Sequence, residues 1–71
     1  MTTVEVFRTN VLTGTQAARL LRVMNERFPG YKVNFDLEDC DKVLRVEADD
    51  VRVNDVMGLL TERGFTCDVL E

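Results

Sequence analysis

The sequence predicts one small α+β domain with the element order βαββαβ. Two segments carry apolar residues at helical spacing, and four carry patterns typical of strands. One helix follows the first strand and the other precedes the last strand, which gives this order. The 71 residues allow a single domain over residues 1–71. A chain this short buries a modest fraction of its surface, so we expect a well-packed core or a second copy that covers part of it.

The first strand is predicted at residues 3–9, which are rich in β-branched side chains. A turn over residues 10–16 leads into the first helix, which ends at Pro29-Gly30. One apolar stripe at helical spacing defines this helix. It consists of Ala17, Leu20, Leu21, Met24 and Phe28.

An antiparallel hairpin is predicted next. Residues 31–37 alternate apolar and polar side chains, as a strand with one wet face does. A polar turn at residues 38–41 follows. The strand at residues 42–48 then places Leu44, Val46 and Ala48 on one side.

The second helix is indicated by Val53, Val56, Met57 and Leu60 at helical spacing. Gly64 is predicted to cap it, with Phe65 as the accompanying hydrophobic contact. The last strand is expected over residues 65–70. This order favours the ferredoxin-like sandwich, in which two helices cover one face of a four-stranded antiparallel sheet.

The net charge and the composition argue against several classes of function. The formal charge of −4 argues against nucleic acid or an anionic membrane as partner. The opening residues lack a signal peptide pattern and no apolar run could span a bilayer, so we expect a cytoplasmic protein. No histidine is present, and we predict no catalytic residue, metal ligand or cofactor.

Two local patterns accompany the element order. They are Leu20-Leu21, one turn into the first helix, and the run from Leu60 to Phe65 that closes the second helix on Gly64. Together they resemble the heavy-metal-associated domain family, which includes copper chaperones. The resemblance spans residues 3–70 and implies a ferredoxin-like fold. In that family a Met-x-Cys-x-x-Cys motif at the first strand-to-helix turn binds the metal.

The chain departs from the family at that motif. Aligned on Leu20, Val11 takes the methionine position, and Thr13 and Gln16 take the two cysteine positions. Soft Cu(I) prefers sulfur, so we expect the metal function to be lost. Thr13 and Gln16 instead fit a helix capping box. The alternative is a remnant ligand loop of Thr13, Gly14, Thr15 and Gln16 that holds an anion at the helix N-terminus.

The first strand suggests a surface for a protein partner or for a homodimer. Val4 and Val6 point one way, whereas Phe7 and Val11 point the other. The family resemblance favours Phe7 inward, simple alternation favours Phe7 outward, and the sequence leaves both open. In either case some apolar surface is exposed. The candidate residues are Val4, Val6, Phe7 and Leu70.

Three other groups have structural interpretations. Cys67 is expected in the core, and Cys40 is expected to be a sluggish nucleophile among acidic neighbours. The acidic residues Asp36, Glu38, Asp39 and Asp41 do not follow a calcium-loop register, so a solvated turn is expected. Arg19, Arg22 and Arg27 lie along the first helix, where we expect them to keep one helix face solvated. The alternative is a basic side that docks an acidic partner.

The sequence therefore predicts a non-enzymatic binding or protein-interaction module that resembles a heavy-metal-associated domain without its thiolate site. Two alternatives remain. One is an ACT-like module that senses an amino acid near the first strand-to-helix turn. The other is a metal carrier that uses atypical ligands. An enzyme has the least support, because the arginine loop of acylphosphatase has no match between the first strand and helix.

Overall fold

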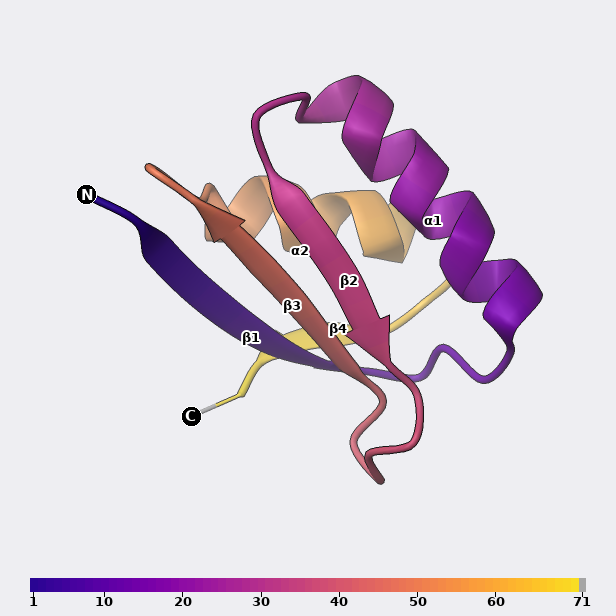
Figure 1. Ribbon diagram of the computed structural model, residues 1–71. Helices are drawn as coiled ribbons and strands as arrows, with labels where there is room; N and C mark the ends of the chain where they lie inside the picture. The colour runs from indigo at the N-terminus through magenta and orange to yellow at the C-terminus, as the bar shows by residue number, and fades with distance from the viewer. Residues whose placement is uncertain (71) are drawn as a thin grey trace.

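The computed structural model describes residues 1–70 and has the predicted element order (Figure 1). The elements are β1 (Thr3–Thr9), α1 (Gly14–Arg27), β2 (Lys32–Asp36), β3 (Val43–Ala48), α2 (Val53–Glu62) and β4 (Cys67–Val69). The strands form one antiparallel sheet in the order β2-β3-β1-β4. The predicted ferredoxin-like α+β fold is therefore confirmed.

One hydrophobic core lies between the sheet and the two helices. Figure 1 shows α2 passing behind β2 and β3. Phe7 of β1 and Leu44 of β3 are register partners, and both are completely buried. The helices contribute Ala17, Leu20 and Met24 from α1 and Val56 and Leu60 from α2, all members of the predicted stripes, together with Leu59 of α2, which the sequence had not singled out. The other predicted stripe residues are only half-buried: Leu21, Phe28, Val53 and Met57. Neither helix within residues 1–70 is long and apolar enough to cross a bilayer.

The structure decides which face of β1 is buried. Phe7 and Val11 both have 0% exposure, whereas Val4 is 41% exposed. Of the two phases that the sequence left open, β1 therefore adopts the one with Phe7 inward. Glu5 shares that inward phase, opposite Val46, and is only half-buried. Burying the large aromatic side chain outweighs the partial desolvation of one carboxylate near the end of the sheet.

The end of α2 forms the predicted glycine cap. Gly64 adopts φ 87°, and its N–H donates to the Thr61 carbonyl at 3.0 Å. The Phe65 N–H donates to the Leu60 carbonyl at 2.9 Å. These two bonds are the Schellman motif, and Phe65 packs against the core beside it.

The last strand is shorter than the predicted range of residues 65–70. β4 spans Cys67–Val69, because Phe65 is committed to the helix cap and the Thr66 N–H donates to Asn10 Oδ1 at 2.8 Å instead of to a neighbouring strand. Leu70 still pairs with the sheet, since its N–H donates to the Val6 carbonyl at 2.8 Å.

Candidate functional site

The β1–α1 turn, where the resemblance places a metal site, is a closed capping box. Thr13 is the N-cap of α1, and its hydroxyl accepts from the Gln16 N–H at 3.1 Å. Gln16 Oε1 in turn accepts from the N–H groups of Thr13 at 3.3 Å and Leu12 at 3.1 Å. The predicted capping box is therefore present, and it gains a third bond because Leu12 also donates to Gln16.

This turn does not fit a soft metal ion. Its polar side-chain groups are a neutral hydroxyl and a neutral carboxamide, and both oxygens already accept backbone N–H groups. Val11, at the position of the family's methionine, is buried in the core and has no sulfur. Two thiolates and a nearby thioether are what Cu(I) selects. The donor set of the turn supplies none of them.

The remnant ligand loop is an exposed turn. Thr13, Gly14 and Thr15 are exposed and Gln16 is half-buried. A Cβ added to Gly14 would meet nothing within 4 Å, so no crowding requires glycine there. The four residues meet at the start of α1 as predicted, but their side-chain oxygens serve the cap.

The face of the sheet opposite the helices, called the open face below, carries an apolar patch. Exposed Val4 and half-buried Val6 of β1 lie on it, and Leu70, also half-buried, joins them because its N–H donates to the Val6 carbonyl. Val43 belongs to the same face because it is the register partner of Arg8. Val43 was not among the residues predicted for this surface. The alternation of residues 42–48 nevertheless places its side chain on the face of the strand that Leu44 does not occupy. Phe7 does not contribute to this patch, because it is fully buried on the other face.

Charged side chains surround this patch in complementary pairs. Across the sheet, Lys32 is the partner of Glu47, and Arg8 is the partner of Asp68. Opposite charges on neighbouring strands stabilise a sheet modestly. With Arg45 and Asp36 included, the described part of the open face holds three positive and three negative side chains. It is locally neutral, whereas the whole chain carries −4.

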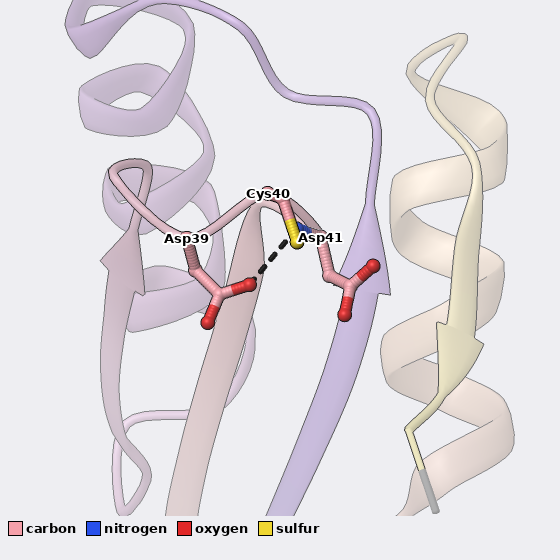
Figure 2. A group of neighbouring side chains, drawn as sticks. All are labelled: Asp39, Cys40 and Asp41. Carbon is pink, nitrogen blue, oxygen red and sulfur yellow. Dashed lines mark hydrogen bonds between the residues drawn. The ribbon is translucent and has the colours of Figure 1, made fainter.

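The turn between β2 and β3 brings Asp39, Cys40 and Asp41 together at its tip (Figure 2). Their potential ligand atoms lie within 4.8 Å of one another. Asp39 Oδ1 accepts the Asp41 N–H at 2.9 Å, which stabilises the turn. Asp39 and Cys40 are exposed. The group consists of three consecutive residues on one turn, and among the described residues no ligand atom from another element joins it. The arrangement agrees with the solvated turn expected from the sequence.

The two cysteines occupy different environments and are both free thiols. Cys67 lies in the core opposite Thr9, with 7% of its surface exposed. Burial, and to a lesser degree the negative charge of Asp68, raise the pKa of its thiol to about 12. A thiol that stays protonated is a poor nucleophile and a poor metal ligand. Cys67 is therefore a core residue, as expected.

The arginines of α1 do not act as one basic side. Arg22 lies 4.0 Å from Glu26 on the same helix, and Arg27 lies 3.7 Å from Glu62 of α2. Arg19 forms no ion pair within residues 1–70. Two of the three predicted positive charges are thus partly neutralised by neighbours.

Comparison with family models and with curated proteins supplies no relative that identifies the site. No protein-family model matches the chain. No curated protein matches it at a significant level.

Proposed function

We propose that this domain is a non-enzymatic, cytoplasmic protein-interaction module, and that its open face docks onto a second copy of the chain. The observation that carries the proposal is the apolar patch of Val4, Val6, Val43 and Leu70 on the uncovered face of the sheet. A patch on the central strand β1 is the natural centre of a sheet-to-sheet contact.

The charge pattern favours a second copy as the partner. A symmetric dimer brings the same surface together twice, so the surface must be complementary to itself. An open face with equal numbers of positive and negative side chains meets that condition. A uniformly charged face would repel its copy. The small size of the domain adds to the benefit of covering apolar surface.

Sedimentation equilibrium of the whole chain, from micromolar to millimolar concentration, tests the proposal. We expect a monomer–dimer equilibrium that Val4→Lys weakens about tenfold, because the new ammonium must be desolvated in the contact. Leu12→Lys is the matched control: Leu12 is 69% exposed but lies on the β1–α1 turn, away from the open face. A wild-type chain that stays monomeric throughout would refute the second copy as partner. Equal weakening by both variants would refute the open face as the contact.

We also propose that the domain resembles a heavy-metal-associated domain that lacks the thiolate site. We therefore expect titration with Cu(I) or Zn(II) to give no tight one-to-one complex, before or after both thiols are blocked. The double variant Thr13→Cys, Gln16→Cys is the positive control, because it restores two sulfur ligands at the family's spacing. A tight wild-type complex that thiol blocking abolishes would support a metal carrier with atypical ligands instead.

A further inference from the structure

A hollow on the helix side of the molecule lies between the first half of α1 and the end of α2. We propose that it binds a small molecule with an apolar body and one carboxylate. The hollow has a volume of about 290 Å³. Its lining residues are Gln16, Arg19, Leu20, Val23, Arg63 and Phe65. We call it the α1–α2 hollow.

Apolar side chains form one part of the lining. Leu20 is 2% exposed, and Val23 and Phe65 are half-buried against the core. Phe65 is held in place by its N–H bond to the Leu60 carbonyl in the helix cap. Val23 and Phe65, packed against the core beside the buried Leu20, offer a hydrocarbon or an aromatic ring an apolar surface that exists before the ligand arrives.

The polar groups of the lining are hydrogen-bond donors. Gln16 Oε1 accepts two backbone N–H groups, and such groups can only donate, so the orientation of this amide is fixed. Its Nε2 is the group left for a ligand. Arg19 and Arg63 add two guanidinium groups, and neither forms an ion pair within residues 1–70. Within residues 1–70, no Asp or Glu side chain lines the hollow.

This combination selects the ligand class. Two guanidinium groups and an amide N–H require an acceptor, and guanidinium matches the planar carboxylate with paired hydrogen bonds. The apolar surface requires a hydrocarbon body. A volume near the lower end of small-molecule pockets requires a small one. An amino acid fits poorly, because its ammonium group would lie beside two arginines with no anionic side chain to pair with.

Binding of 3-phenylpropionate to the full chain tests the proposal by NMR of ¹⁵N-labelled protein. We expect saturable shifts at the Gln16 side-chain amide and at the backbone N–H groups of Leu20 and Phe65. Two matched compounds are the controls: 3-phenylpropanamide lacks the charge, and L-phenylalanine adds the amino group. Both should bind about tenfold more weakly or worse. The amide loses the charge-assisted contact, and the ammonium group of phenylalanine would lie beside two arginines with no anionic side chain to pair with.

Variants locate the site. Arg63→Gln and Arg19→Gln should each weaken binding of 3-phenylpropionate about tenfold. Arg22→Gln is the matched control, because it removes the same charge from α1 at a residue outside the hollow. It should change the affinity less than about twofold, as expected for a screened charge at a distance.

Three results of these experiments would overturn the inference, and a fourth would come from a phosphate titration. They are the absence of saturable shifts with 3-phenylpropionate, equal or tighter binding of either matched compound, and equal weakening by Arg22→Gln. Tighter binding of inorganic phosphate would also overturn it, since the apolar surface would then have no role. The inference does not depend on the proposed dimer, because the hollow and the open face lie on opposite sides of the sheet.

Discussion

Thr13 and Gln16 satisfy backbone N–H groups at the start of α1 that would otherwise depend on water. The Thr13 hydroxyl accepts from the Gln16 N–H, and Gln16 accepts from Thr13 and Leu12. The same turn that holds a metal in the family thus holds a helix N-terminus here. One pair of side chains cannot easily serve both purposes, because each oxygen is already occupied.

Replacement of Thr13 tests this role. Thr13→Ala removes the acceptor for the Gln16 N–H, and we expect the free energy of unfolding to fall by about 1 kcal/mol. Thr13→Ser keeps the hydroxyl and should remain close to wild type. Urea denaturation of the three proteins measures the difference. If Thr13→Ala unfolded at the wild-type urea concentration, the capping box would contribute nothing to stability.

Because the Cys67 thiol is buried, the free energy of unfolding depends on pH in the alkaline range. Its pKa rises from 9.0 to about 12 in the folded chain. Below pH 9 the thiol is protonated in both states and its contribution is constant. Between pH 9 and about 12 the unfolded chain loses the proton and the folded chain keeps it, so stability falls as pH rises.

Comparison of the wild type with Cys67→Ala isolates this effect. We expect the wild type to lose more stability than Cys67→Ala across that alkaline range, as measured by urea denaturation at each pH. In the native state a thiol reagent should modify exposed Cys40 much faster than Cys67. Equal rates for the two thiols would mean that Cys67 is not protected by the core.

At the scale of the element, α2 has one glycine inside it and one just after its end, and the two have opposite roles. Gly58 lies inside the helix, and a Cβ there would meet nothing within 4 Å. Gly64 adopts φ +87° in the Schellman motif, a conformation that side chains with a Cβ rarely adopt. The first glycine weakens the helix, whereas the second ends it.

Alanine at each glycine should therefore act in opposite directions. We expect Gly58→Ala to raise the free energy of unfolding by about 0.5–1 kcal/mol. Gly64→Ala should lower it by about 1 kcal/mol, because the left-handed conformation is then strained. Thermal unfolding followed by circular dichroism measures both. A shift of the same sign for both variants would contradict the assignment of Gly64 as the helix cap.

The other end of α2 depends on a partner distant in sequence. Arg52, the N-cap, provides no side-chain hydrogen bond, and its N–H donates to the Tyr31 hydroxyl at 2.8 Å. Tyr31 stacks on Phe28 with the ring centroids 4.8 Å apart. The sequence placed Tyr31 in a strand, but β2 begins at Lys32. Tyr31 instead links the end of α1 to the start of α2.

At the scale of the whole molecule, the sheet separates two proposed binding surfaces. The open face carries Val4 and Val6, and the α1–α2 hollow lies on the helix side. No proposed contact residue is shared. We therefore expect Val4→Lys to leave the affinity for 3-phenylpropionate unchanged and Arg63→Gln to leave self-association unchanged. Reciprocal titration and sedimentation of the two variants measure this, and a cross-effect would show that the surfaces are coupled.

The sequence by itself determined the element order and the two helix caps. Both depend on interactions between residues close in the chain, such as the Thr13–Gln16 pair and the bonds around Gly64, and local patterns report such interactions directly. It also determined that no pair of sulfur ligands occupies the β1–α1 turn, because residue identity alone decides that.

Only the tertiary structure decided which face of β1 is buried, because β1 has apolar side chains on both faces and the choice depends on packing against Leu44 and the helices. It also made β4 begin later than predicted, through a bond from the Thr66 N–H to Asn10 that no local pattern contains. The α1–α2 hollow likewise exists only because folding brings Arg63 and Phe65 beside Arg19. These features arise from contacts between residues distant in sequence, which single-chain periodicity does not record.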